Sequence, residues 1–187
     1  MIRTLFLSAL AVLAITVSSP SHAAPAIGQA APDFTGTDSN GKSHKLSDFK
    51  GKIVVLEWTN PGCPFVVKHY DSKNMQKLQE EAVAKDVVWL SVNSSAEGKE
   101  GYQSPSDANQ YVADKGAKAT ARILDPTGEI GKLYDAKTTP HMFVINKEGI
   151  LVYDGAIDSD DSFKPETIAG ATNYVSQALA AVEAGEA

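Results

Sequence analysis

The run Ile53-Val54-Val55-Leu56 constrains the fold more than any other part of the sequence. Consecutive apolar and mostly β-branched residues are typical of a strand that is buried on both faces and therefore lies inside a sheet. The run continues directly into Glu57-Trp58-Thr59-Asn60-Pro61-Gly62-Cys63-Pro64, after which apolar residues recur at helical spacing. The sequence thus predicts a central strand, a short loop and a helix that begins near Phe65.

The other predicted elements alternate between strands and helices. A hairpin is expected around the Asn40-Gly41 turn. Apolar patterns predict further strands at 87–92, 121–125, 142–145 and 150–153, and helices at 65–83 (interrupted at 71–74), 107–115, 129–134 and 165–184. This order predicts an α/β fold, with a central mixed sheet flanked by helices and an N-terminal β-hairpin extension. The length of 187 residues suits one domain, expected over residues 24–187.

Residues 1–23 have the pattern of a cleaved secretory signal peptide. Arg3 precedes an apolar run over Leu5–Val17, and Ser21-His22-Ala23 supplies small residues before a cleavage point. The run is too short to span a bilayer as a helix. We therefore expect a secreted or periplasmic protein that meets the membrane only through this segment.

The chain is acidic, with a formal charge of −6 that becomes −7 when Arg3, the only charged residue of the first 23, is removed. Nucleic acids and anionic lipids bind to basic surfaces. No nucleic-acid partner is therefore expected.

Cys63 is the only cysteine, so the chain cannot form an internal disulfide. A lone thiol is unusual in an exported protein, because exported cysteines usually pair within the chain. Pro64 suits the first position of a helix, which would make Cys63 the N-cap. Unpaired N–H groups and the positive end of the helix dipole favour the thiolate, the species that attacks peroxides and disulfides. The alternative is a small buried side chain, since free cysteine is among the most buried residue types.

Two motifs, Trp58-Thr59-Asn60-Pro61-Gly62-Cys63-Pro64-Phe65-Val66 and Thr138-Thr139-Pro140-His141, resemble the thioredoxin-like superfamily. The resemblance is to its exported redoxin branch, which includes alkyl hydroperoxide reductase and thiol-specific antioxidant proteins, and it extends from about Ile27 to Ala180. It implies a thioredoxin-like fold with a cis bond before Pro140, beside Cys63. It also implies reduction of a peroxide or disulfide substrate through a sulfenic acid or mixed disulfide, with an external thiol reductant or a thioredoxin-like redox partner regenerating the thiol.

Three departures from the family pattern concern this same site. Val66 stands where the family's dithiol has its second cysteine, and Asn60 stands where typical peroxiredoxins have threonine. The arginine that those enzymes place beside the cysteine has no counterpart near Thr139, and the position of Arg122 does not match it. These departures disfavour ordinary dithiol exchange and fast peroxide reduction, and they favour monothiol redox chemistry.

Asn60, Glu57 and His141 are candidate catalytic residues beside Cys63. Asn60 is a possible hydrogen-bond donor to a bound peroxide or sulfenate. Glu57, at the end of an apolar strand, is either a desolvated proton acceptor or a carboxylate that points out of the sheet edge. His141 either stabilises or protonates the thiol, or is a polar residue satisfied near the surface.

Partner docking is predicted to involve Trp58, Pro64 and Phe65 together with Thr139 and Pro140, with plain core packing as the alternative for the two aromatic residues. No cofactor is expected, and the four histidines show no metal-ligand spacing. Two other functions remain open. One is a thioredoxin-fold binding module without turnover, and the other is a copper metallochaperone, a role for which two cysteines are usual.

Overall fold

A computed structural model describes residues 24–186, so the predicted signal peptide lies outside the described residues. The elements follow one another in the predicted alternation. They are β1 (Thr35–Asp38), β2 (Ser43–Lys45), the 3-10 helix η1 (Leu46–Phe49), β3 (Val54–Trp58), α1 (Pro64–Asp71), α2 (Asn74–Ala84), β4 (Val88–Asn93), α3 (Pro105–Lys115), β5 (Ala121–Leu124), α4 (Glu129–Leu133), β6 (His141–Ile145), β7 (Leu151–Gly155), the 3-10 helix η2 (Pro165–Gly170) and α5 (Tyr174–Ala184).

One seven-stranded mixed sheet organises the described residues, in the order β2-β1-β5-β4-β3-β6-β7. Strand β3 runs parallel to β4 and antiparallel to β6, and β4 runs parallel to β5. The β1–β2 hairpin joins the sheet through β5, and β7 forms the opposite edge. The predicted α/β fold, mixed sheet and N-terminal hairpin are confirmed.

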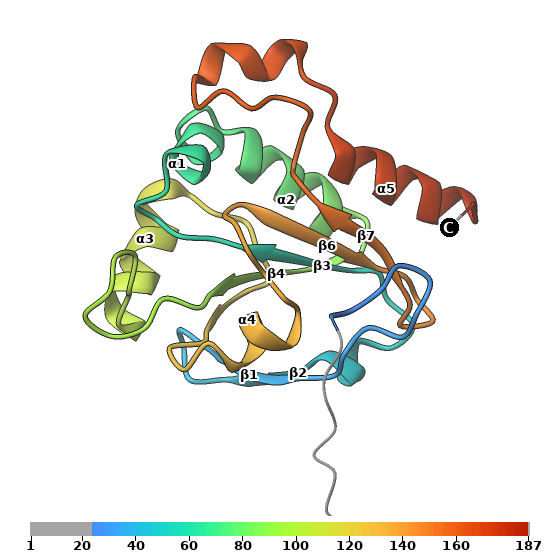
Figure 1. The fold of residues 1–187 in the computed structure, drawn as a ribbon, viewed down its shortest axis with the longest axis horizontal. Helices are drawn as coiled ribbons and strands as arrows, with labels where there is room; N and C mark the ends of the chain where they lie inside the picture. The colour runs from blue at the N-terminus through green and yellow to red at the C-terminus, as the bar shows by residue number, and fades with distance from the viewer. Residues whose placement is uncertain (1–23, 187) are drawn as a thin grey trace, which may run out of the picture.

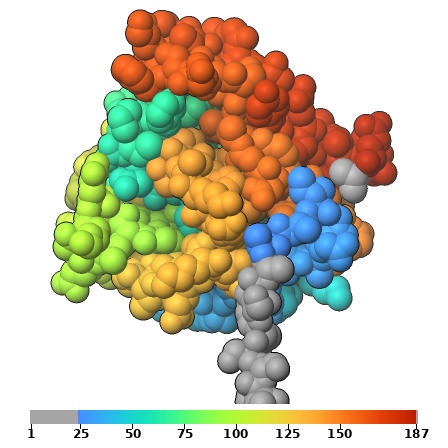
Figure 2. Space-filling view, in the orientation of Figure 1, coloured from blue at the N-terminus to red at the C-terminus, as the bar shows by residue number. Residues whose placement is uncertain are grey.

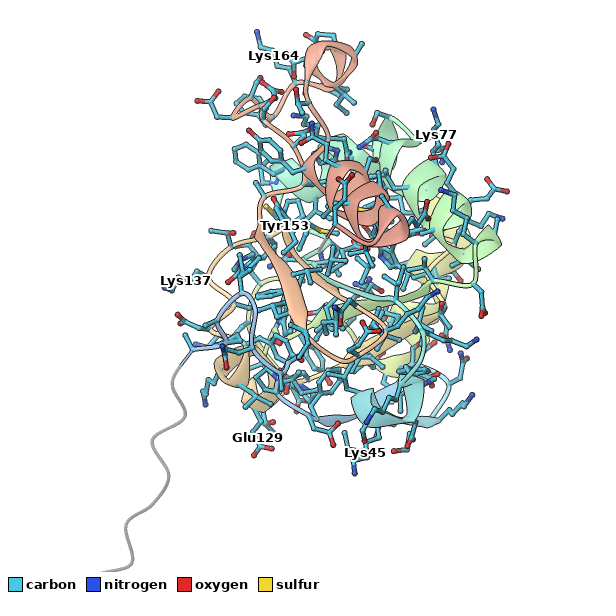
Figure 3. The ribbon with its side chains drawn as sticks, turned by 90° about the vertical axis from the view of Figure 1, so that its right-hand side faces the viewer. Lys45, Lys77, Glu129, Lys137, Tyr153 and Lys164 are labelled. Carbon is cyan, nitrogen blue, oxygen red and sulfur yellow. The ribbon has the colours of Figure 1, made fainter. Side chains whose placement is uncertain are left out.

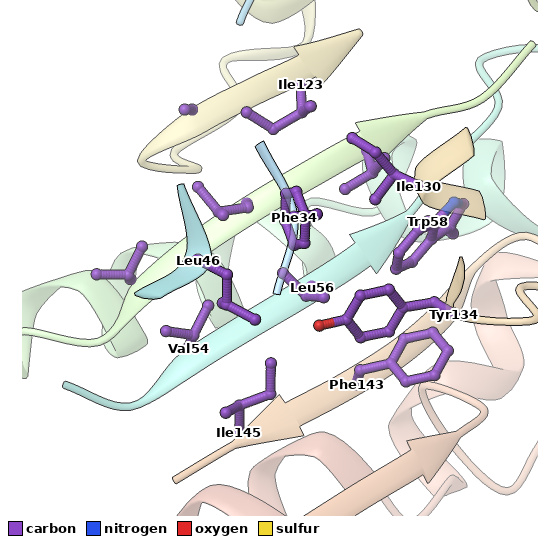
Figure 4. Packing of buried hydrophobic residues seen from close by; sticks show 14 of the residues in the cluster. Phe34, Leu46, Val54, Leu56, Trp58, Ile123, Ile130, Tyr134, Phe143 and Ile145 are labelled. Carbon is purple, nitrogen blue, oxygen red and sulfur yellow. The ribbon is translucent and has the colours of Figure 1, made fainter. Parts of the chain in front are cut away.

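Two apolar clusters cover the two faces of this sheet. Helices α1, α2 and α5 lie over one face, and α4 lies over the other (Figure 1). The α4 cluster includes Leu56, Trp58, Tyr134 and Phe143, whose side chains pack together in Figure 4. The α1 cluster includes Val55, Val66, Tyr70, Met75 and Trp89. Because side chains alternate along a strand, β3 contributes to both clusters and is buried throughout.

Two predicted helices are corrected by the structure. The predicted helix at 165–184 is divided into η2 and α5, because Asn173 pairs with Asp158 in an isolated bridge and caps α5 through its side chain. Helix α3 begins earlier than predicted, since Ser104 and not Asp107 is its N-cap. The predicted interruption after α1 is confirmed, and Lys73 adopts a left-handed backbone there (φ 65°). No helix in residues 24–186 has the length and apolar character needed to cross a membrane.

The close approach of β1 to β5 and α4 leads to a stability prediction. A Cβ atom on Gly36 would lie 2.5 Å from Ile123 Cγ2 and 3.0 Å from Ile130 Cδ1, in the core beneath α4. We expect Gly36→Ala to lower the free energy of unfolding by about 1–3 kcal/mol, measured by urea denaturation. Gly170→Ala is the matched control, because a Cβ there would meet no atom within 4 Å. Equal stability of the two variants would contradict this packing.

Candidate active site

Cys63 is the last residue of the loop that connects the central strand β3 to helix α1. It is the N-cap of α1, with Pro64 at the first helical position, as predicted. The loop is closed by a backbone hydrogen bond from Cys63 N–H to the Asn60 carbonyl (3.1 Å). The cysteine is half-buried and packs against the α1 cluster. Its thiol is thus partly open to solvent at the N-terminus of a helix.

The segment before β6 brings Thr139 and Pro140 against this thiol. The Thr139–Pro140 peptide bond is cis, which confirms the sequence prediction. The Cys63 thiol donates a hydrogen bond to the Thr139 carbonyl oxygen, with Sγ 3.0 Å from it. The proximity follows from the sheet, because β3 and β6 are antiparallel neighbours and β3 ends where β6 begins. In Figure 2 the chain around α1, the loop after β4 and the loop before β6 border one another on one face.

A polar hollow of about 240 Å³ borders Thr139, the residue whose carbonyl oxygen accepts from the Cys63 thiol. Its walls are the ends of β3 and β4 and the loop before β6. Thr59, which is 1% exposed, lines it, and the Thr59 hydroxyl has no hydrogen-bond partner among the described residues. A buried hydroxyl without a partner is costly unless a ligand or water satisfies it. The Thr59 hydroxyl is itself buried, so it is an unsatisfied polar group inside the protein just after β3.

Asn60 joins the cysteine loop to the loop between β4 and α3. Its Oδ1 accepts from the Gly62 N–H (2.8 Å), and its Nδ2 donates to the Glu100 carbonyl oxygen (3.4 Å). Gly101 has φ +80°, and a Cβ there would overlap the Asn60 amide. Both polar ends of the Asn60 side chain are therefore engaged in holding the two loops together.

Glu57 is fully buried and faces α1 and α2, so of the two interpretations the desolvated carboxyl is the one observed. Burial raises the pKa of this carboxyl, although hydrogen bonds from Trp89, Tyr70 and Gln79, and the charge of Arg122, act to lower it. The three donors lie 2.8–2.9 Å from its oxygens. A buried acid with a raised pKa is a general candidate for proton transfer. The Glu57 oxygens accept hydrogen bonds from these three donors and not from Cys63.

The hydrogen-bond partners of Glu57 were not identified from the sequence. Tyr70 comes from α1, Gln79 from α2 and Trp89 from β4, so only the packing of these elements brings them together. Burial and the Glu57 carboxylate raise the pKa of Tyr70 well above its usual range. The one available signal was a polar residue at the end of an apolar strand.

His141 lies beside Pro140, but its ring is directed away from the thiol. Its Nε2 bonds Asp154 Oδ1 (2.7 Å), and its Nδ1 accepts from the Lys137 N–H (3.3 Å). His141 is paired with Trp58 across β3 and β6 and packs on Phe143, which places it on the α4 face. Cys63 packs on the opposite face. This geometry favours the alternative of a satisfied polar side chain.

The predicted docking residues differ in their accessibility. Trp58 is only 3% exposed and donates to Ser94 Oγ (3.1 Å), so it is mainly part of the core. Phe65, two residues after Cys63, is 38% exposed, and Pro64 between them is exposed as well. Thr139 and Pro140 are half-buried. An apolar ring, the thiol and the Thr139 segment are thus available to a partner together.

Metal binding would require a cluster of ligands. Among residues 24–186, no group of three or more His, Cys, Asp or Glu side chains is arranged to hold a metal ion.

The chain is similar in sequence to thiol-disulfide oxidoreductases and to peroxiredoxins. The thiol-disulfide oxidoreductase ResA of Bacillus thuringiensis subsp. konkukian (strain 97-27) is 30% identical over 128 residues, 67% of each chain. The chloroplastic peroxiredoxin Q of Oryza sativa subsp. japonica is 27% identical over 156 residues, which are 81% of this chain and 67% of that protein.

A solved structure supports the same assignment of the fold. The crystal structure of an uncharacterized conserved protein from Geobacillus kaustophilus matches with a TM-score of 0.70 at 27% identity, covering 85% of this chain and 81% of that one. The family described as Redoxin matches residues 26–172. Because this match includes β1 through β7, Cys63 and Pro140, the chain belongs to the redoxin family, within the thioredoxin-like superfamily.

Proposed function

We propose that this protein is an exported monothiol oxidoreductase that acts through Cys63. The observation that carries the proposal is the half-buried thiol at the N-cap of α1, in contact with the Thr139 carbonyl before cis Pro140. Thiol-disulfide exchange requires an accessible thiolate and a surface on which the partner sulfur can approach. Residues 1–23 support export, and the names of the relatives support thiol redox chemistry.

The proposed reaction proceeds through a mixed disulfide. The Cys63 thiolate attacks one sulfur of a substrate disulfide, so that a Cys63–substrate disulfide forms and the other substrate sulfur leaves as a thiolate. Val66 is fully buried one turn along α1 and provides no second thiol. An external thiol must therefore attack the mixed disulfide and release Cys63. A second external thiol then attacks the disulfide formed between the first one and the substrate. Both substrate sulfurs thus leave as thiols, and two external thiols are oxidised to one disulfide.

A peroxide is the second candidate substrate, favoured by the name of the peroxiredoxin Q relative. In this reaction the thiolate takes one oxygen to become a sulfenic acid, and the rest of the peroxide leaves as an alcohol or water. An external thiol then forms a mixed disulfide and releases water. Arg122 is buried beneath Tyr111 and bonded to Gln103, so it provides no charge at the thiol. We therefore place disulfide exchange first.

The other residues receive supporting roles in this proposal. Asn60 and His141 are positioning residues, because Asn60 fixes the cysteine loop and His141 fixes the segment before Pro140. Glu57 is the candidate proton acceptor. Phe65, Pro64, Thr139 and Pro140 form the docking surface.

The test is formation of the mixed disulfide with neutral hydroxyethyl disulfide, followed by intact mass. The wild-type protein is expected to gain one half-disulfide, and Cys63→Ser is expected to gain none. Hydrogen peroxide in a parallel reaction is expected to add one oxygen more slowly. No reaction of folded wild-type protein with either reagent would refute a redox function and leave a binding module. Oxidation by hydrogen peroxide that is faster than the reaction with hydroxyethyl disulfide would make a peroxide the first candidate substrate and a disulfide the second.

Glu57 leads to a pH prediction. Because its pKa is raised in the folded state, the unfolded chain releases this proton at a lower pH than the folded one. The stability that Glu57 contributes is therefore complete below about pH 4.3, its ordinary pKa, and is lost as pH rises through the folded pKa. The loss is about 1.4 kcal/mol per pH unit over that window.

Glu57→Gln should remove this slope, so that urea denaturation from about pH 4 to 8 shows wild type losing stability relative to the variant. Glu81→Gln, which changes an exposed acid of α2, is the control and should follow the wild-type profile. Parallel profiles for wild type and Glu57→Gln would show that this pKa is not raised.

A further inference from the structure

The carboxylate of Glu100 lies against the residue that precedes the reactive cysteine. Glu100 is an exposed residue of the loop between β4 and α3. Its Oε1 is 3.1 Å, and its Cγ 3.6 Å, from the point where a Cβ on Gly62 would lie. Gly62 is bonded directly to Cys63. Because Gly62 has no side chain, the Glu100 carboxylate can lie close to the backbone next to the cysteine.

The loop that carries Glu100 is fixed to the cysteine loop. The Glu100 carbonyl accepts from Asn60 Nδ2 (3.4 Å), and Asn93 Nδ2 donates to the Gly101 carbonyl (2.8 Å). The Asn60 amide packs directly over Gly101, where any side chain would collide with it. The backbone at Glu100 is thereby held on both sides, and the carboxylate is kept near Gly62.

No cation neutralises this carboxylate within the described part of the chain. Among those residues, no Lys, Arg or His nitrogen lies within 4 Å of it. The two basic side chains that flank Thr139 and Pro140 are paired with acids, since Lys137 bonds Asp135 (2.9 Å) and His141 bonds Asp154 (2.7 Å). Lys137 projects from the surface in Figure 3. A carboxylate without an ion pair therefore lies against Gly62, the residue next to Cys63.

We propose that Glu100 is a specificity-determining residue, which selects polypeptide thiols and disulfides that carry a lysine or arginine next to the reacting cysteine. This inference rests on the proposed thiol chemistry of Cys63. An unpaired carboxylate attracts a cationic partner and repels an anionic one. The attracted partner then forms the mixed disulfide with Cys63 that the proposed reaction requires. Charge complementarity of this kind affects mainly the rate of association.

The test uses two small thiol reagents of the same reaction type and opposite charge, trimethylammonioethyl and sulfonatoethyl methanethiosulfonate, and compares the ratio of their rate constants between variant and wild type. With either reagent the Cys63 thiolate forms a disulfide and methanesulfinate leaves. At about 0.01 M ionic strength, Glu100→Gln should lower the ratio of the cationic to the anionic rate constant about threefold to fivefold. At about 1 M salt the difference from wild type should disappear, because the charge is screened.

Glu97→Gln is the matched control, since it removes the same charge from an exposed position in the same loop. An equal change of the ratio in Glu97→Gln and Glu100→Gln would overturn the proposal, as would no change in either. Neutral methyl methanethiosulfonate should react with all three proteins at the same rate. Failure of hydroxyethyl disulfide exchange would refute the proposed function, whereas an unchanged charge ratio with intact exchange would refute only the role of Glu100.

Discussion

Strand β3 is hydrogen-bonded to β4 on one side and to β6 on the other, and both of its faces are buried. Each part of the site is placed relative to this strand. Its end positions Cys63 at the N-cap of α1, and its pairing with β6 brings the Thr139 carbonyl to the thiol. The free energy of burying β3 on two faces therefore stabilises the site as well as the core.

The surroundings of Glu57 are buried, whereas those of the Cys63 thiol are partly exposed to solvent. The core around Glu57 excludes water and surrounds a carboxyl group with donors from three elements, which makes this region rigid and polar inside. The thiol surface, in contrast, has the exposed ring of Phe65 and a polar hollow that borders Thr139. A fixed interior next to an open surface suits a residue that must meet external sulfur atoms, because this chain provides no second thiol.

The features predicted correctly from the sequence depend on local pattern. The apolar run at Ile53–Leu56, the Pro64 signal and the cis bond at Pro140 each follow from neighbouring residues or from the family motif. Features set by tertiary contacts were missed. The break before α5 depends on the pairing of Asn173 with Asp158, and the partners of Glu57 depend on the packing of α1 and α2 against β4. Glu100 lies in a loop without periodicity, so no sequence pattern indicates that it reaches Gly62.

The central claim is that Cys63 alone completes a redox cycle with an external thiol. The most direct measurement is repeated turnover of a protein disulfide by wild-type protein and by Cys63→Ser, with a small thiol as reductant in excess. We expect a rate above background that is proportional to the concentration of wild-type protein and absent from the variant. Equal rates for the two proteins, both folded, would contradict it.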